Sequence, residues 1–531
     1  MFDLLIANGS VLDGSGGPAY RADVGIAGDR IAAIGQLAGL EAARVLDAAE
    51  RYVTPGFIDI HTHSDESVVL NRRMESKIRQ GVTVEVGGNC GGSAAPVLGE
   101  AAQAEAKDLA RYQYALDWRS LEEYLDRVQA GGISSNFATL VGNGTLRASV
   151  MGAVMRPSTA GEMAEMKSLL AESLQAGAWG LSTGLIYPPS NYAGTQELIE
   201  LAKVSAEHGG IYASHIRNEG AGLLDAVREA ITIGEQAGIP VEIAHHKASG
   251  RAHWGKVKES LAMIEAARAR GIQVTCDQYP YTASSTGLSV LIPDWAHEGG
   301  AERMVERLQD PAARARIAQE MRESRPGWEN AALESGWHNI LIAGARKNHE
   351  LDGKTTWDLA ELWGRDPVEA VMDLLVAEEG SVSIVIFSMC EDDVKMVMRA
   401  PFVMVGSDSG AKAPYGPLSE GKPHPRAYGT FPRLLARYVR EQGVLTWPEA
   451  VRKMTSLPAG KLGLDRRGLL VEGSFADVVV FDPLSVADTA TFVEPHQYPV
   501  GIDCVLVNGV VTVERGEHTG ALAGRLLRRG A

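Results

Sequence analysis

The sequence predicts an α/β protein built on a (β/α)8 TIM-like barrel, and three observations support this prediction. Short apolar segments alternate with amphipathic ones through most of the chain, as in the units of a parallel sheet. Glycines stand where the amphipathic segments end, as helix C-caps do. Side chains suited to metal binding follow several apolar segments, and barrels carry their chemistry at the carboxyl ends of their strands.

The expected barrel strands are short and apolar. They lie at residues 56–60, 82–86, 136–144, 179–187, 211–216, 240–246, 273–281 and 402–405. Residues 383–387 form a ninth candidate, so one of the nine segments lies outside the barrel. An open, doubly wound parallel sheet is the main alternative architecture.

The two ends of the chain differ from its middle. Residues 1–54 and 465–531 contain short strand-like segments separated by tight turns. The pairs Asn8-Gly9, Gly28-Asp29 and Asn508-Gly509 are hairpin signals. We therefore expect a small β-sandwich domain assembled from both termini, flanking a barrel domain at residues 55–464. The 531 residues are enough for both domains.

The alternation of strands and helices breaks between about residues 284 and 380. This segment follows the seventh expected strand and contains neither repeats nor low-complexity sequence. It is interpreted as an insertion that could cover the end of the barrel where the chemistry is expected.

Composition limits the classes of protein to consider. The net charge of −16 at pH 7 argues against nucleic acid or an anionic membrane as a partner. No apolar run approaches the length of a membrane span, and no basic segment of a signal peptide is visible. The four cysteines lie far apart without a Cys-x-x-Cys motif, as in a reducing cytosol. A cytoplasmic location is the expectation.

Candidate metal ligands follow five of the expected strands. They are His61 and His63 after the first, Cys90 after the second, His215 at the end of the fifth, His245 and His246 at the end of the sixth, and Asp408 after the eighth. Imidazole, thiolate and carboxylate groups that meet at one end of a barrel form the kind of tetrahedral site that zinc prefers. The pattern therefore predicts a zinc site. The remaining histidines are expected to be solvated, and the remaining cysteines to be small buried residues.

These strand ends resemble a known family. The two histidines after the first strand, single histidines after the fifth and sixth, and Asp408 are similar to the metal-dependent amidohydrolase superfamily. More narrowly, the chain resembles the N-acyl-D-amino acid deacylases, or D-aminoacylases, in the segments GNCGG, GLSTGLIYPP, YASHIRNE, AHHKASG, DQYPYTASST, GSDS and KPHPRAYGTFPR. Many superfamily members carry a metal-bridging lysine on the fourth strand. That lysine is missing here, and Cys90 stands on the second strand instead.

The resemblance implies a zinc-dependent enzyme that hydrolyses small-molecule substrates, the N-acyl-D-amino acids, to a carboxylate and a free D-amino acid. The implied ligands are Cys90, His215 and His245 for a tightly bound zinc, and His61, His63 and Asp408 for a weaker second position. Asp408 is also the expected proton carrier, which takes a proton from the attacking water and passes it to the leaving amine. His246 is expected to point away, because adjacent strand residues face opposite sides.

The resemblance also implies a cationic clamp for the substrate α-carboxylate. Lys247, Arg426 and one of two tyrosines, Tyr279 or Tyr281, match the residues that hold this group. Residues 282–295 include no basic side chain, which favours neutral or hydrophobic substrate side chains over D-glutamate or D-aspartate. Selectivity for the D-isomer rests on the resemblance, because sequence spacing does not show where the clamp lies relative to the metal.

Two alternative functions stay open. A cyclic-amide hydrolase of the dihydroorotase or hydantoinase type would use the same barrel, although it would normally carry the lysine on the fourth strand. A non-catalytic scaffold with this fold would be expected to have lost ligands, whereas this chain retains them. Activity on a ring amide would reveal the first alternative, and a stoichiometric metal assay tests the second.

Overall fold

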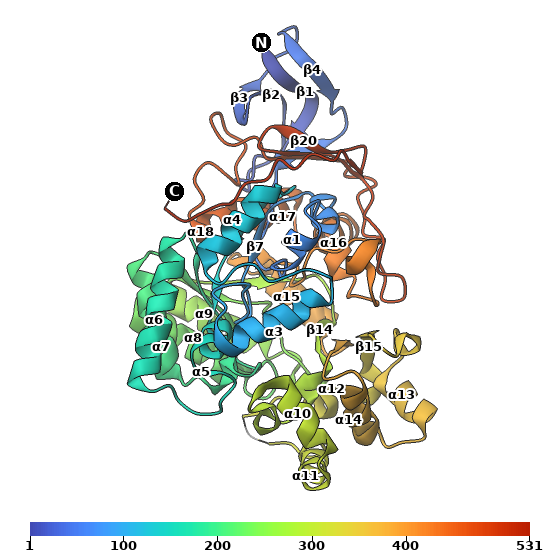
Figure 1. Cartoon of the computed structure of the whole chain (residues 1–531). Helices are drawn as coiled ribbons and strands as arrows, with labels where there is room; N and C mark the ends of the chain where they lie inside the picture. The colour runs from blue at the N-terminus through green and yellow to red at the C-terminus, as the bar shows by residue number, and fades with distance from the viewer. Residues whose placement is uncertain (326, 531) are drawn as a thin grey trace.

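The computed structural model describes residues 1–325 and 327–530. Figure 1 shows three parts along the length of the molecule. Strands from the N-terminus lie at one end, and parallel strands with their helices occupy the middle. A group of helices from residues 300–377 lies at the other end (Figure 1).

Two parallel sheets form the middle of the molecule. One contains β6 (Phe57–Asp59), β7 (Val82–Gly87) and β8 (Asn136–Thr139). The other contains β9 (Val141–Gly142), β10 (Gly180–Gly184), β11 (Ile211–His215), β12 (Val241–Ile243), β13 (Val274–Gln278) and β17 (Val403–Val405). Each expected barrel segment therefore holds a parallel strand, and the third is divided between β8 and β9. A parallel bridge between Thr62 and Ser409 joins the segments that follow β6 and β17.

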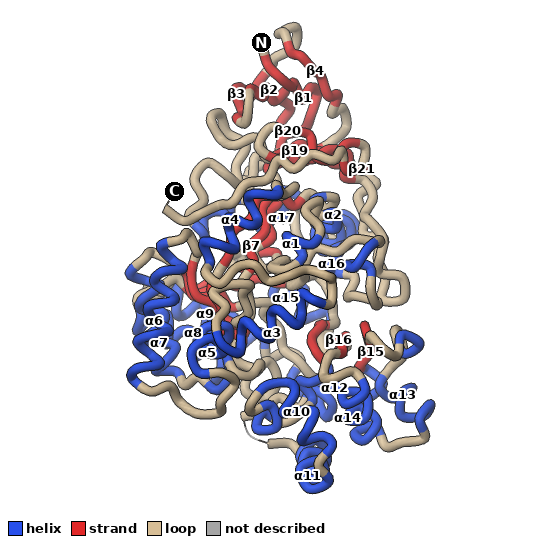
Figure 2. The backbone as a smooth tube through the Cα atoms, in the orientation of Figure 1, coloured by secondary structure: helices blue, strands red, loops and turns tan. Residues whose placement is uncertain are grey.

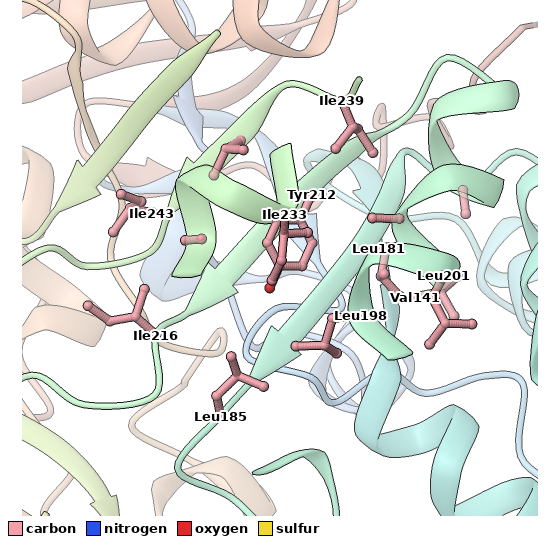
Figure 3. Close-up of a cluster of buried hydrophobic side chains, with 14 of the residues drawn as sticks. Val141, Leu181, Leu185, Leu198, Leu201, Tyr212, Ile216, Ile233, Ile239 and Ile243 are labelled. Carbon is pink, nitrogen blue, oxygen red and sulfur yellow. The ribbon is translucent and has the colours of Figure 1, made fainter. Parts of the chain in front are cut away.

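Amphipathic helices cover these strands, as the sequence pattern predicts. Helix α8 (Leu223–Ala237) buries a face at helical spacing and ends at Gly238, which adopts the left-handed conformation of a C-cap. It packs with α7 (Thr195–Glu207) against the neighbouring strands, where Ile233 and Tyr212 share one apolar core (Figure 3). This packing holds the strands in place from outside and leaves their carboxyl ends free for polar side chains.

The remaining α-helices of the middle part, and one π-helix, follow one another in chain order. They are α1 (Ser67–Leu70), α2 (Glu75–Ile78), α3 (Gly99–Ala110), α4 (Leu121–Gly131), α5 (Asn143–Met151), α6 (Ala160–Gln175), α9 (Val257–Ala269), α15 (Glu391–Arg399), α16 (Arg426–Arg433), the π-helix Leu434–Glu441, α17 (Trp447–Met454) and α18 (Ser456–Leu462). Within the described ranges, no helix combines the length and the apolar character needed to cross a membrane.

Strands from both termini pair in one nine-stranded sheet, drawn in red at the top of Figure 2. Its members are β1 (Phe2–Val11), β2 (Tyr20–Ala27), β3 (Arg30–Gly35), β4 (Ala42–Asp47), β5 (Tyr52–Pro55), β18 (Val478–Phe481), β19 (Ile502–Val507), β20 (Val510–Glu514) and β21 (Glu517–His518). β5 joins the two halves, because it pairs with β1 and with β18. A two-layered sandwich arrangement of this sheet stays a prediction.

One turn prediction in this sheet is wrong. Asn508-Gly509 connects β19 with β20, and Gly28-Asp29 connects β2 with β3, as expected for hairpins. Asn8-Gly9 instead lies inside β1, at a shift of register against β2. Asn8 has a φ of 64° there, so the same tolerance for left-handed backbone serves a β-bulge and not a hairpin.

A buried polar network joins the terminal sheet to the parallel strands. Arg467 forms an ion pair with Asp477 and donates from Nη2 to Asn508 Oδ1 at 2.8 Å. Asn508 donates from its backbone to Asp477 Oδ1 and from Nδ2 to Asn136 Oδ1, each at 2.8 Å. Asn136 begins β8 and donates from Nδ2 to Asp477 Oδ2 at 3.3 Å, so the network connects the terminal sheet with the parallel strands through an amide pair and a charge-assisted hydrogen bond.

The insertion after β13 forms a unit with its own apolar core. Its antiparallel sheet consists of β14 (Ser284–Gly287), β15 (Ile340–Ala345) and β16 (Val382–Ile386). Its helices are α10 (Gly300–Gln309), α11 (Pro311–Met321), α12 (Ala331–Ser335), α13 (Thr356–Trp363) and α14 (Pro367–Ala377). The ninth strand candidate is therefore β16, which lies outside the parallel sheets.

We predict that Arg467→Met lowers the free energy of unfolding by about 3–5 kcal/mol, because the buried Asp477 carboxylate loses its cation. The midpoint of urea unfolding measures this loss. Arg466→Met is the matched control, since Arg466 pairs with Asp465 at the surface, where an ion pair contributes little. Equal midpoints for the two variants would contradict a stabilising role for the network.

Candidate active site

The predicted metal-binding side chains meet at the carboxyl ends of the parallel strands. Donor atoms of His61, Cys90, His245 and Asp408 lie within 4.8 Å of one another, as do those of His215, Glu219 and His245. His63 Nε2 lies 3.0 Å from Asp408 Oδ1. The ligand cluster consists of His61, His63, Cys90, His215, His245 and Asp408. Strand ends far apart in the sequence thus bring every predicted ligand together.

Cys90 lies at the centre of the ligand cluster. Its Sγ is 3.3 Å from His61 Nε2 and 3.5 Å from His245 Nε2. His245 Nε2 is also 2.8 Å from His215 Nδ1. The other ring nitrogen of His215 is buried and has no hydrogen-bond partner among the described residues. Nitrogen and sulfur lone pairs therefore converge on one small volume.

Two buried carboxylates hold the histidines from outside. Asp277 Oδ2 lies 3.1 Å from His61 Nδ1, and Asp277 Oδ1 accepts the backbone N–H of His245 at 2.9 Å. Glu219 Oε1 lies 3.0 Å from His245 Nδ1 and accepts from Lys247 Nζ at 2.6 Å. With Nδ1 turned to a carboxylate, each imidazole presents Nε2 to the ligand cluster. The sequence interpretation did not single out either carboxylate, although Asp277 stands in an expected strand and Glu219 ends the segment YASHIRNE.

Cys90 and Asp408 carry negative charge in the ligand cluster. Burial acts to raise the pKa of the Cys90 thiol, but His61 and His245 hold this pKa well below its usual value. Burial likewise acts to raise the pKa of the Asp408 carboxyl, and Arg426 and His245 hold it well below the usual range. The donor set is thus a thiolate, a carboxylate and imidazole nitrogens. These donors fit a zinc ion.

Left-handed backbone shapes the ligand cluster. Cys90, His245 and Asp408 have φ values of 51°, 35° and 51°, a conformation that non-glycine residues rarely adopt. Such residues persist only where the surrounding structure holds them, and they gather at functional sites. At the Cys90 turn, a Cβ on Gly91 would lie 2.5 Å from the backbone nitrogen of Gly184, so this close approach requires glycine.

The predicted carboxylate clamp lies beside the ligand cluster. Arg426 Nη1 is 2.7 Å from Asp408 Oδ2, and the guanidinium carbon lies 4.6 Å from the ring centre of Tyr279. Lys247 Nζ lies 5.7 Å from the same ring centre. The Tyr279 hydroxyl is buried and has no hydrogen-bond partner among the described residues. Tyr279 therefore lies between the two cations, with its hydroxyl available.

Two of the residues singled out in the sequence lie away from this arrangement. The ring of Tyr281 faces Arg433, whose guanidinium carbon is 4.6 Å from the ring centre. His246 Nε2 lies 2.8 Å from Ser260 Oγ, on the side away from the ligand cluster. Between the two candidate tyrosines, the geometry favours Tyr279.

A cavity extends from the ligand cluster toward the insertion. Its lining includes His215 and Asp408 from the strand ends, and Thr286 and Trp328 from the insertion. The insertion therefore forms one wall of the cavity. Tyr187 lines the same space, at the end of the fourth expected strand.

The sequence interpretation did not single out Tyr187. Its ring packs edge-on against His215, with ring centres 5.1 Å apart, and its hydroxyl lies 3.1 Å from Thr286 Oγ1. Burial and the negative charge of Cys90 raise the pKa of Tyr187 well above its usual value, so the hydroxyl is neutral. Tyr187 could have been recognised from the sequence, because it stands at a strand end within the segment GLSTGLIYPP.

The cavity wall is acidic. The cations among the described lining residues are Arg217 and Lys247. Arg217 pairs with Glu229 at 2.9 Å, and Lys247 is held by a carboxylate as described above. Burial raises the pKa of Asp294 to about 6 and that of Glu329 to about 7. A second carboxylate on a ligand would meet no unpaired cation among these residues.

Comparisons with known proteins point to one family. The sequence model of the amidohydrolase family matches residues 44–513. The chain belongs to this family. A D-aminoacylase of Alcaligenes xylosoxydans xylosoxydans is 39% identical to this amidohydrolase over 530 residues, which cover 100% of this chain and 98% of the relative.

Two solved structures are similar over the whole length of this amidohydrolase. The first is a D-aminoacylase described with a binuclear metal centre, one metal activating and the second attenuating. It is 38% identical and covers 100% of both chains, with a TM-score of 0.84. The second is an N-acyl-D-glutamate deacylase from Bordetella bronchiseptica with zinc and a phosphonate inhibitor. It is 37% identical and covers 99% of both chains, with a TM-score of 0.84.

We predict that Asp277→Asn weakens the binding of a divalent metal by about 10–100-fold. The two carboxylate oxygens of Asp277 accept from His61 Nδ1 and from the backbone N–H of His245. The side-chain amide of asparagine has only one oxygen acceptor, so its NH2 group would face one of these N–H donors. Competition for Zn2+ with a chelator measures the change. Asp225→Asn, at an exposed position in α8, is the control. Unchanged affinity in Asp277→Asn would show that this carboxylate does not orient the ligands.

Proposed function

We propose that this amidohydrolase uses zinc to hydrolyse the amide bond of N-acyl-D-amino acids, releasing a carboxylate and a free D-amino acid. The observation that carries the proposal is the ligand cluster next to the cations Lys247 and Arg426. The reaction needs a metal site and a binding site for an α-carboxylate at one cavity. Relatives named for this activity are 39% and 37% identical over almost the whole chain, which supports the same reaction here.

The proposed metal ligands divide into two groups. Cys90, His215 and His245 are assigned to a tightly bound zinc, and His61, His63 and Asp408 to a weaker second position. The donor distances of 2.8–3.5 Å among Cys90, His215 and His245 support the first assignment. Zinc bound there supplies a Lewis acid that activates water and polarises the acyl carbonyl at neutral pH.

Asp408 is the proposed catalytic proton carrier. It is ionised at neutral pH, because its pKa is held well below the usual value, so it can accept a proton from the attacking water. His63 at 3.0 Å and Arg426 at 2.7 Å orient its two oxygens. The protonated carboxyl group then gives the proton to the departing amine. The neutral hydroxyl of Tyr187 is placed to donate to the carbonyl oxygen as its negative charge develops.

Lys247, Tyr279 and Arg426 are proposed to bind the substrate α-carboxylate. Arg426 offers a planar donor set for a carboxylate, and the free hydroxyl of Tyr279 lies between the two cations. Tyr281 is not assigned this role, because it lies against Arg433. Selectivity for the D-isomer is inferred from the named activities of the relatives.

Neutral or hydrophobic substrate side chains are the proposed preference. Among the described residues, the cavity lining offers no unpaired cation to a carboxylate on the substrate side chain, and it includes the acidic side chains Asp294 and Glu329. Overall identity does not decide this point, because the D-aminoacylase and the N-acyl-D-glutamate deacylase are similar to the chain to nearly the same degree.

We further propose that the parallel strands close into a (β/α)8 barrel. The bridge between Thr62 and Ser409, and the single residue between β8 and β9, support closure. The proposed domains are residues 1–54 with 465–531 as the terminal β-domain, and residues 55–464 as the barrel with its insertion. We propose that the substrate is a small molecule and that the reaction takes place in the cytoplasm.

We expect free amine to be released from N-acetyl-D-leucine, -methionine and -phenylalanine, and more slowly from N-acetyl-D-glutamate. The matching L-isomers should give no release. Removal of metal with a chelator should abolish the activity, and Zn2+ should restore it. An assay for primary amine, together with metal analysis of the protein, measures both results.

Asp408→Asn should lower kcat by about 10²–10⁴-fold, since it removes the proton carrier. Asp225→Asn, an exposed carboxylate on α8, should leave kcat unchanged. If the zinc-loaded protein released no amine from any D-substrate, the proposal would fail. Hydrolysis of a dihydropyrimidine or hydantoin ring would then indicate the cyclic-amide alternative.

A further inference from the structure

Lys77 is a fully buried lysine that takes no part in the reaction described above. It lies in α2 and has no exposed surface. Its Nζ donates to Asp59 Oδ2 at 2.9 Å, to the hydroxyl of Ser407, and to the carbonyl oxygen of Ser409 at 2.7 Å. The three donors of the ammonium group are therefore all used.

The partners of Lys77 stand beside the ligand cluster in the sequence. Two of them are the residues on either side of Asp408, and Asp59 precedes His61 by two residues. Asp59 Oδ1 also accepts the backbone N–H of Ser407 at 2.9 Å. The backbone N–H of Asp408 donates to the His61 carbonyl at 2.9 Å. One buried ion pair thus connects the end of the first parallel strand with the end of the last.

The backbone between these contacts is left-handed. Asp408 has a φ of 51°, which an aspartate adopts only when its surroundings compensate for the unfavourable conformation. Relaxation of this residue would turn its carboxylate away from His63 and Arg426. The contacts of Lys77 and Asp59 hold the chain on both sides of the strained residue.

We propose that Lys77 is a positioning residue: paired with Asp59, it holds the backbone on both sides of Asp408 and so directs the Asp408 carboxylate into the ligand cluster. The inference rests on the proposed function through the role of Asp408 as proton carrier. Lys77 itself touches neither substrate nor reacting atoms. Its effect is on the direction from which the proton is taken and returned.

The burial of this ion pair supports a role beyond stability. Both side chains have no exposed surface, so both charges lose their hydration on folding. Apolar side chains of similar volume often replace such a pair without loss of stability. An apolar pair would not supply donors to the hydroxyl and carbonyl groups that flank Asp408. This directional requirement explains why a charged group is present here.

The test is the steady-state kinetics of Lys77→Met with N-acetyl-D-leucine. We expect kcat to fall by about 10–100-fold, because a small misplacement of a catalytic group costs rate steeply. KM should change by less than about threefold, because Lys77 forms no hydrogen bond or ion pair with Lys247, Tyr279 or Arg426 among the described residues. Zinc at the position assigned to Cys90, His215 and His245 should stay bound, since Asp277 and Glu219 hold His245. A variant that is folded and zinc-loaded but has the wild-type kcat would overturn the proposal.

Lys453→Met is the matched control for the loss of a buried lysine. Lys453 is 1% exposed, and its Nζ donates to the carbonyl oxygens of Ala400 at 2.5 Å and Val403 at 3.0 Å. These contacts lie at the opposite end of the same strand, β17. We expect lower stability and an unchanged kcat. An equal fall in kcat in both lysine variants would mean that Lys77 is only structural.

Two further variants separate positioning from folding. The double variant Asp59→Asn/Lys77→Met removes both charges and keeps an acceptor for the Ser407 N–H, so it should be more stable than Lys77→Met and still have a low kcat. Ser407→Ala removes one contact without changing charge, and it should lower kcat by about three- to tenfold with KM unchanged. Recovery of kcat together with stability in the double variant, or a wild-type kcat in Ser407→Ala, would contradict the proposal.

Failure of this inference is distinguishable from failure of the proposed function. If the wild-type protein releases amine from D-substrates and Asp408→Asn does not, the deacylase function holds whatever Lys77→Met does. If the wild-type protein is inactive on every D-substrate, the function fails first, and the role of Lys77 in that reaction fails with it.

Discussion

Buried lone pairs that meet at the carboxyl ends of the parallel strands are the physical constraint on which the rest of this structure depends. Nε2 of His61 lies 3.3 Å from Sγ of Cys90 and 3.5 Å from Oδ1 of Asp408. Such a group is unfavourable in a protein interior unless protons or a metal ion neutralise it. Asp277 and Glu219 turn the imidazoles so that they face this point. The surroundings of the ligand cluster are therefore built to hold a cation.

Strained backbone at the strand ends directs the metal-binding side chains toward one another. A side chain that simply continued its strand would point along the alternating faces of the sheet. Left-handed residues at Cys90, His245 and Asp408 redirect the side chains inward. Their conformations are maintained by neighbouring contacts, such as the close approach of the Gly91 turn and the buried ammonium of Lys77. Rigidity around the ligand cluster thus comes from residues that are not themselves ligands.

The insertion lies where the proposed selectivity for the substrate side chain would be set, whereas the strand ends carry the groups proposed for the chemistry. Residues of β14 and of the segment around Trp328 form the wall opposite the ligand cluster. That wall includes the acidic side chains Asp294 and Glu329, and Arg217, which also lines the cavity, is paired with Glu229; the proposed preference for neutral substrate side chains rests on these features. Two relatives of nearly equal identity carry names with different substrates, so overall similarity does not distinguish the substrate side chain.

The sequence by itself determined the strand positions and the candidate ligands, because apolar periodicity, glycine caps and polar residues after strands are local patterns. It did not reveal Asp277, Glu219, Tyr187 or Lys77, whose roles depend on partners distant in the chain. The choice of Tyr279 over Tyr281 and the pairing of Arg426 with Asp408 also needed the tertiary structure. Asn8 does adopt left-handed backbone, as the pair Asn8-Gly9 indicates, but the pair forms a β-bulge and not a hairpin turn. Local conformation follows from neighbouring residues, whereas the partner of a buried charge is decided only when distant strand ends come together.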